Sequence, residues 1–332
     1  MIAGVPTTTM RQGQWGTAAR PKLTHARIAH ATALGERLAR DLGDPERFAA
    51  RLAAGFHELA DRDYRDSQAF VAPGIGPTHG VRTPLQVALR KGFEKGSRKF
   101  STSELLLIAA RLLGAEEREA RWFAITALQR TLEREPERTW QLLRRAAADA
   151  DDWITVDTLA HPFGKGILAE PYRWAELEQL TVSPSRWERR LVGSTIATIP
   201  FVNRRDGRAS PVAEHALPIL ATLIGDSEPD VQRALSWAYR SMTLVDQEAT
   251  TRALESEMDA TVRAADGHRA WVIRDSLPKL SPDRAAAIRD GLAGIRRRPG
   301  APATSQAAEL ATRFAGMGLG RALPEPPLAV SR

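Results

Sequence analysis

Apolar positions along most of this chain recur at the three- and four-residue intervals of an amphipathic helix. Short polar, glycine- or proline-containing segments separate these stretches, and the alternating Val, Ile and Thr runs typical of strands are nearly absent. The pattern predicts helices over residues 22–41, 45–61, 84–95, 102–113, 116–133, 137–149, 153–160, 170–180, 184–199, 211–224, 228–244, 246–264, 267–277 and 281–293. The predicted fold class is therefore all-α.

The predicted helices follow one another in pairs, and tryptophan recurs along them. These tryptophans are Trp122, Trp153, Trp187, Trp237 and Trp271. Helix pairs that recur every ~35–45 residues are typical of HEAT-like repeats, which stack into a curved solenoid with a long concave surface. We expect Trp122, Trp140 and the Trp271–Asp275 pair to belong to the repeat core.

The two ends of the chain differ in composition from its middle. Residues 1–20 are rich in Thr, Gly and Gln, and we expect this segment to be disordered. Residues 21–295 carry the helical pattern and are expected to form one HEAT-like domain. Residues 296–332 are rich in Pro, Ala and Gly and are expected to form a mobile tail, although 305–314 can supply a turn or two of helix.

The charge balance indicates a polyanionic partner. The chain has a formal net charge of +7 and a pI near 10.2, and most of its cations are arginine, which suits bidentate phosphate contacts. A genome that favours arginine codons would produce the same bias. We interpret the charge as a basic concave surface that follows double-stranded DNA.

Residue usage excludes several other classes of protein. The chain has no cysteine, which rules out disulfides and thiolate metal sites. Its seven histidines are scattered without a metal-ligand spacing: His25, His30, His57, His79, His161, His215 and His268. No stretch of about 18 apolar residues occurs. We expect a soluble, cytoplasmic monomer that needs no metal or organic cofactor.

Trp153 and Asp157 are the first candidate site residues. Their four-residue spacing places them on one helix face. An indole beside a carboxylate suits a cationic group, which the ring attracts by cation–π forces and the carboxylate by Coulomb attraction. The alternative is a core tryptophan with Asp157 capping a neighbouring helix.

Arginines cluster in the next two repeats. Arg186, Arg189 and Arg190 surround Trp187 near a helix N-terminus, where backbone N–H groups also favour phosphate. The alternative is a solvated face paired with Glu188.

Further along the chain, arginine and tryptophan alternate. Arg233, Trp237 and Arg240 share one helical stripe that suits DNA backbone contacts. Arg204 and Arg205, in the preceding polar loop, either contact DNA or belong to an ordinary flexible loop.

The order of these motifs resembles the AlkD-like DNA alkylation-repair glycosylases. The matching segments are Gly80–Pro84, the REARWFAITAL helix at 118–128, WITVD at 153–157, WERR at 187–190 and ALSWAYR at 234–240. The resemblance covers residues from about 60 to 280. It implies a HEAT-like array that excises cationic alkylated purines, such as N7-methylguanine and N3-methyladenine, from duplex DNA.

The resemblance also implies residue roles. Trp153, Asp157 and Trp237 would line the catalytic site, Arg190 would hold the DNA backbone, and Trp187 would pack in the core. Relatives commonly carry a second tryptophan where this chain has Asp152, which adds a negative charge beside the proposed site.

Two alternatives from other classes remain. One is a non-catalytic HEAT-like protein that binds distorted or branched DNA, against which the presence of Asp157 argues. The other is a protein-binding scaffold, which would not need the alternation of Trp and Arg. The leading interpretation is a monofunctional DNA glycosylase that hydrolyses the N-glycosidic bond, with bulkier adducts as a possible substrate variant.

Overall fold

The computed structural model describes residues 23–99 and 101–316, and all regular secondary structure in these ranges is helical. Short 3-10 turns follow or precede several helices: η1 (Ala39–Asp41), η2 (Leu180–Val182), η3 (Asp206–Arg208) and η4 (Leu277–Lys279). The α-helices are α1 (His25–Leu38), α2 (Pro45–Leu59), α3 (Arg62–Val71), α4 (Thr83–Gly96), α5 (Thr102–Leu113), α6 (Arg118–Leu128), α7 (Pro136–Ala148), α8 (Trp153–Ala169), α9 (Arg173–Gln179), α10 (Arg186–Val202), α11 (Ser210–Leu223), α12 (Pro229–Met242), α13 (Gln247–Ala264), α14 (Gly267–Ser276), α15 (Pro282–Gly291) and α16 (Gln306–Gly316).

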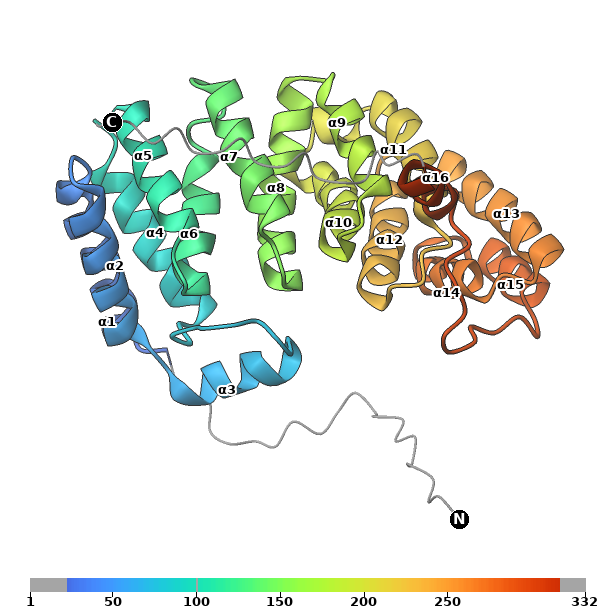
Figure 1. Cartoon of the computed structure of the whole chain (residues 1–332), viewed down its shortest axis with the longest axis horizontal. Coiled ribbons are helices and arrows are strands. Elements are labelled where there is room, and N and C mark those ends of the chain that lie inside the picture. The colour runs from blue at the N-terminus through green and yellow to red at the C-terminus, as the bar shows by residue number, and fades with distance from the viewer. Residues whose placement is uncertain (1–22, 100, 317–332) are drawn as a thin grey trace, which may run out of the picture.

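The helices stack side by side into an arch (Figure 1). Helices α6, α8, α10, α12 and α14 pack against one another in succession and lie on the concave side of the arch; we call them the inner row. The helices that precede each of them in sequence, α5, α7, α9, α11 and α13, lie on the opposite side. This is a helical-repeat solenoid, as the sequence predicted.

One hydrophobic core runs the length of the arch. Phe48 near the N-terminal end, Val156 and Leu235 in the middle and Ile273 near the C-terminal end are all fully buried members of it. Each helix buries its apolar stripe on its neighbours rather than around a single centre, as expected for stacked repeats. Trp140 is buried in this core, as predicted, whereas Trp122 is buried in a separate small cluster with Ala72 and Ile75.

Helix α8 is longer than predicted. The sequence prediction ended this helix at residue 160. Although Pro162 removes a backbone N–H, the helix continues through it to Ala169. Phe163 and Ile167 beyond the proline are fully buried. Burial of their side chains offsets the lost hydrogen bond, so packing overrides the local propensity of proline.

Helix α3 was not predicted. Its sequence, RDYRDSQAFV, is mostly polar, and of its side chains only Gln68 is fully buried. Asp61 caps it by accepting a hydrogen bond from the Tyr64 N–H at 3.1 Å. Helix α3 stands apart from the stacked helices, at the concave side of the arch (Figure 1).

The segment that follows residue 295 packs on the array as far as the structure describes it. The Thr304 N–H donates to the Gly225 carbonyl at 2.8 Å, and Ser305 and Ala307 are buried. Helix α16 contacts α11 and η2. This part of the predicted mobile tail is therefore folded against the domain. Residues 1–20 and 317–332, also predicted to be disordered or mobile, lie outside the described residues.

No helix in the described part of the chain is long and apolar enough to span a membrane.

Helices α10 and α12 approach closely at Gly193. A Cβ atom on this glycine would lie 2.8 Å from the backbone carbonyl carbon of Ala234 and 2.9 Å from its Cβ. Neither atom belongs to a flexible side chain, so the helices would have to separate.

We predict that Gly193→Ala lowers the free energy of unfolding by about 1–3 kcal/mol, the usual cost of overpacking a rigid contact. Urea denaturation followed by far-UV circular dichroism measures this change. Gly43→Ala is the matched control, because a Cβ at Gly43 meets no atom within 4 Å. Equal stability of the two variants would contradict a tight α10–α12 contact.

Candidate active site

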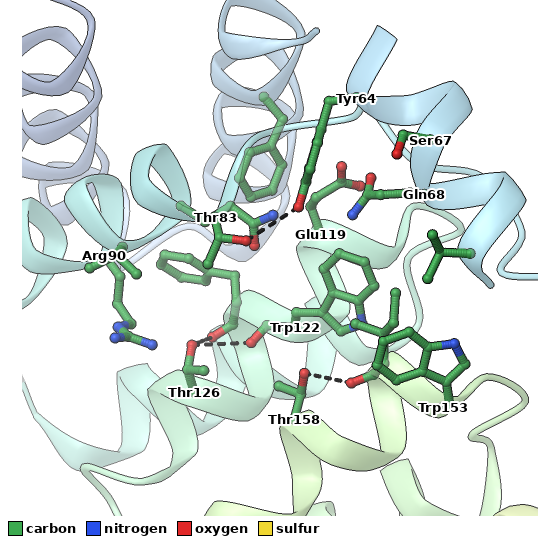
Figure 2. A pocket seen from close by; sticks show the side chains of 16 residues that line it. Tyr64, Ser67, Gln68, Thr83, Arg90, Glu119, Trp122, Thr126, Trp153 and Thr158 are labelled. Carbon is green, nitrogen blue, oxygen red and sulfur yellow. Dashed lines mark hydrogen bonds between the residues drawn. The ribbon is translucent and has the colours of Figure 1, made fainter. Parts of the chain in front are cut away.

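Helix α8 presents a stripe of chemically active side chains. Trp153, Asp157, His161 and Lys165 follow one another at four-residue intervals and therefore share one face of the helix. Asp157, His161 and Lys165 line the same groove, and Trp153 lines a cavity beside it (Figure 2). The predicted pair of Trp153 and Asp157 is thus the first half of a longer stripe.

The Asp157 carboxylate is held by two side chains of α10. Arg190 donates from Nη2 to Oδ2 at 2.9 Å and to Oδ1 at 3.1 Å, and from Nε to Oδ1 at 3.2 Å. Ser194 donates from Oγ to Oδ1 at 2.7 Å. The side chain of Asp157 keeps 24% of its surface exposed. The carboxylate is therefore fixed on one side and open on the other.

Arg190 faces the protein rather than solvent. Only 8% of its side-chain surface is exposed. Besides the bonds to Asp157, Nη1 donates to the Asp230 carbonyl at 2.8 Å, and the guanidinium carbon lies 5.8 Å from the centre of the Trp153 ring. This geometry makes Arg190 a positioning residue for Asp157, and its contact with the DNA backbone stays a prediction.

A cationic groove adjoins Asp157. It has a volume of about 500 Å³, and its cations come from three neighbouring segments: Arg90 of α4, Arg130 of the turn after α6, and Lys165 of α8. The other lining residues are Glu94, Thr126, Gln129, Thr158 and His161. Sequence analysis missed these cations, because no linear spacing relates residues of different helices; Lys165 alone could have been found from the four-residue stripe on α8.

His161 lies in this groove as a neutral side chain. Burial lowers the pKa of His161, and the positive charges of Lys165 and Arg90 lower it further. Its Nδ1 atom is buried without a hydrogen-bond partner among the described residues. The groove lining carries three cations against the two carboxylates of Asp157 and Glu94, and this excess of positive charge favours phosphate. No group of three metal-ligating side chains occurs in the described ranges.

The other predicted arginines fall into two groups. Arg189 is tied to the protein: it donates to Asp226 at 2.7 Å and to the carbonyl of Ser183 at 2.8 Å. Arg240 is likewise tied, donating to the Asp275 carboxylate at 2.7 Å. The structure therefore uses both of these guanidiniums to connect neighbouring segments, and their DNA contacts remain predictions.

The remaining predicted arginines are exposed. Arg186 stacks over Trp187 at 4.6 Å, and Arg233 lies 3.4 Å from the Asp230 carboxylate. Arg204 and Arg205 lie in the loop before η3 and are also exposed. Their side chains are accessible to a polyanion.

Trp187 and Trp237 are both half-buried and pack against the core. For Trp187 this agrees with the expected role. Trp237 follows Ser236 on α12, a helix that packs on α10, and its role at the catalytic centre stays a prediction.

Asp152 is a buried helix cap. Its carboxylate accepts from the Thr155 N–H at 2.8 Å and from the Thr155 hydroxyl at 2.5 Å, and the same hydroxyl accepts from Trp122 Nε1 at 2.9 Å. Arg118 lies 3.8 Å from it. The negative charge that sequence analysis placed beside the site is therefore directed into the protein, where it fixes the start of α8.

Two buried charges of α6 hold the loop between α3 and α4. Glu119 accepts from the backbone N–H groups of His79, Gly80 and Val81, at 2.8–3.2 Å. Arg118 donates to the carbonyl of Ile75 and to Asp151. Gly80 has a φ of +78°, and a Cβ there would lie 2.5 Å from the Asp61 carbonyl oxygen. The loop between α3 and α4 is thus held in one conformation.

A comparison with known protein families agrees with this geometry. The family model described as DNA alkylation repair enzyme matches residues 52–280, which is more than half of the chain. The chain belongs to this family, which indicates a role in DNA repair. No curated protein sequence matches the chain.

We predict that Asp152→Ala lowers the free energy of unfolding by about 1–2 kcal/mol, since it removes the cap of α8 and leaves the Thr155 hydroxyl without its acceptor. Chemical denaturation measures the change. Asp149→Ala is the matched control, because Asp149 and its partner Arg145 are both exposed and such an ion pair is worth less than about 1 kcal/mol. A loss that is larger for Asp149→Ala would contradict this account.

We predict that His161 titrates below the ordinary pKa of histidine and makes stability depend on pH. Because its pKa is lower in the folded state than in the unfolded state, the unfolded chain binds more protons between the two values. Stability should therefore fall as the pH drops below about 6.5, and the loss should end below the folded-state pKa. Imidazole NMR titration of the wild type and His161→Gln checks this; an unshifted His161 signal would refute it.

Proposed function

We propose that this chain is a monofunctional DNA glycosylase that hydrolyses the N-glycosidic bond of cationic alkylated purines in double-stranded DNA, without a metal or organic cofactor. N7-alkylguanine and N3-alkyladenine are its proposed substrates. The observation that carries the proposal is the Asp157 carboxylate, which Arg190 and Ser194 hold on one side while its other side faces a cationic groove. Membership in the DNA alkylation repair family supports a repair role.

The chemistry needs few groups. An alkylated purine already carries a positive charge, so it leaves without a general acid. Its departure produces an oxocarbenium-like deoxyribose, as in other glycoside cleavages. A fixed carboxylate such as Asp157 stabilises this cation and orients or deprotonates the attacking water. Trp153 and Trp237 are proposed to add π-electron density on the sugar side of the site.

Arg190 and Ser194 make Asp157 suited to this task. Three guanidinium bonds and one hydroxyl bond fix the carboxylate before substrate arrives, so little reorganisation is needed as positive charge develops. The open edge of Asp157 remains available to the sugar or to water.

The groove supplies the contacts to DNA. Arg90, Arg130 and Lys165 line the groove beside Asp157 and are proposed to contact DNA phosphates. The exposed Arg186, Arg204, Arg205 and Arg233 would extend these contacts along the arch. A protein that binds DNA mainly through such cations loses affinity steeply as salt increases.

The second candidate is a non-catalytic protein that binds distorted or branched DNA. The cationic groove fits this function as well. The orientation of Arg190 does not favour it, because a binding protein gains more from a guanidinium that contacts phosphate than from one that holds a carboxylate. Base release separates the two candidates.

We predict that the wild type releases N7-methylguanine from a methylated duplex and that Asp157→Asn reduces the release rate at least ~100-fold, the usual loss when an electrostatic catalytic group is removed. DNA binding should survive, because the substitution removes a negative charge. Chromatography of the free base and fluorescence anisotropy of a labelled duplex measure the two quantities.

The matched control is Asp275→Asn. Asp275 accepts from Ser236 at 2.5 Å and from Arg240 at 2.7 Å, much as Asp157 accepts from Ser194 and Arg190, but it lies at the other end of the inner row. Its loss should leave base release within a few-fold of the wild type. Absence of release by the wild type from every alkylated duplex, with binding intact, would favour the non-catalytic candidate.

A further inference from the structure

The segment between α15 and α16 lies across the N-terminal ends of two inner-row helices. We call residues 296–305 the C-terminal strap; in Figure 1 it is the orange-red chain that passes beside α14 and continues to α16. Arg297 of the strap donates from Nη1 to Gln232 Oε1 of α12 at 2.7 Å, and its guanidinium carbon lies 5.7 Å from the centre of the Trp271 ring of α14. The family match ends at residue 280, so the strap lies outside it.

A buried amide and an imidazole hold the strap on these helices. The Gln232 side chain is fully buried, and its Nε2 atom donates to His268 Nδ1 at 3.0 Å. Because Nδ1 accepts this bond, Nε2 is the ring nitrogen that donates, and it lies 3.0 Å from the carbonyl oxygen of Ala301 in the strap. One series of hydrogen bonds thus connects Arg297 through Gln232 and His268 to a second point of the strap.

The strap backbone approaches the starts of both helices closely. A Cβ atom on Gly267, the first residue of α14, would lie 2.6 Å from the Arg297 Cα atom. A Cβ atom on Gly225, in the turn before α12, would lie 2.7 Å from the Ser305 nitrogen. The strap is therefore a fixed part of the fold, and the side chains beside Arg297 leave the backbone at a defined place.

Two arginines flank the anchored Arg297 without partners of their own. Arg296 and Arg298 are exposed, and neither side chain forms a hydrogen bond or an ion pair with another described residue. Burial lowers the pKa of Arg274 of α14, and the positive charge of Arg296 lowers it further. Arg274 donates to the carbonyl of Ile295 at 2.8 Å, a neutral acceptor. Like charges therefore gather at the strap.

The carboxylates of the two helices do not neutralise this charge. Each carboxylate of α12, of α14 and of the turns before them already pairs with another arginine: Asp226 with Arg189, Glu228 with Arg186, Asp230 with Arg233, Asp266 with Arg269 and Asp275 with Arg240. The strap cations are therefore in excess of the negative charge beside them. A polyanion is the partner that such a surface attracts.

The strap borders the inner row, at a distance from Asp157 that a duplex can bridge. Trp271, on which Arg297 stacks, belongs to α14, and this helix lies on the concave side of the arch (Figure 1). Packed helices lie about 8–10 Å apart, and α10 and α12 stand between α8 and α14. The strap therefore lies about 25–30 Å from Asp157, which corresponds to about eight base pairs at ~3.4 Å each.

We propose that Arg296 and Arg298 contact the phosphate backbone of a duplex that lies along the arch, at the end of the inner row remote from Asp157. Arg297 is the anchor that positions them. The C-terminal strap thus lengthens the DNA-binding surface beyond the segment that the family match covers. DNA as the partner rests on the proposed function, but the contact does not require base release.

The test compares two double variants with the same change in net charge. Arg296→Gln/Arg298→Gln removes the two strap cations. Arg145→Gln/Arg252→Gln removes two exposed cations from α7 and α13, on the opposite side of the arch. Affinity for an unmodified, fluorescently labelled duplex of about 30 base pairs, longer than the estimated span, is measured by anisotropy over a series of salt concentrations. Circular dichroism verifies that both variants fold.

We expect the strap variant to bind more weakly at low salt and to reduce the slope of log K against log salt by about two, since each lost phosphate contact lowers it by about one. The control variant should keep the wild-type slope. Arg296→Lys/Arg298→Lys should also keep it, because lysine still neutralises phosphate.

Three results would overturn the strap contact: equal slopes for the two glutamine variants, a lysine variant that behaves like the strap glutamine variant, or no binding of duplex by the wild type. The proposed glycosylase is tested separately. If the strap variant changes the slope but the wild type releases no base from alkylated duplexes, the strap contact stands and the proposed function fails.

Discussion

The ion pair between Asp157 and Arg190 is the interaction on which the candidate site depends. It joins α8 to α10, and Arg190 extends it to α12 through the Asp230 carbonyl, so three helices of the inner row are connected through one guanidinium. Burying a guanidinium costs free energy unless its N–H groups are hydrogen-bonded to acceptors. Close stacking of α10 on α12 at Gly193, and of α8 on α10, brings these acceptors within reach. The site is thus a product of repeat packing rather than of a loop.

A second aspartate held by a serine and an arginine occurs between α12 and α14. The comparison shows that this arrangement of side chains alone does not make a candidate active site. Asp275 accepts from a serine and an arginine of the neighbouring helix, and Trp271 precedes it by four residues as Trp153 precedes Asp157. The side chain of Asp275 is 46% exposed, and Arg297 lies 5.7 Å from the Trp271 ring centre. Asp157 differs by lining a cationic groove, while Trp153 on the same helix face lines an aromatic cavity beside that groove. The groove and cavity around Asp157, more than its bonds to Arg190 and Ser194, distinguish the candidate site.

Sequence reasoning recovered what depends on local spacing. The helical period predicted the all-α solenoid, and the four-residue spacing placed Trp153 and Asp157 on one face. It did not predict that Arg190 turns to Asp157, because a residue's partner on another helix depends on packing. For the same reason Arg90 and Arg130 were missed. Asp152 was interpreted as a negative charge beside the proposed site, and its role as the cap of α8, which directs the carboxylate to Thr155, was not predicted.

The distribution of charge around Asp157 favours catalysis over binding alone. A groove with Arg90, Arg130 and Lys165 would attract DNA more strongly without a carboxylate in its wall. Arg190 pairs with this carboxylate from one side only, and part of the Asp157 side chain stays exposed to the groove. The Asp157 carboxylate repels phosphate, yet four hydrogen bonds hold it in one orientation. In the proposed reaction, a carboxylate fixed in this way stabilises the positive charge that the sugar carries only during bond cleavage. The proposed glycosylase therefore gives the carboxylate a role, whereas a protein that only binds DNA would have no role for it.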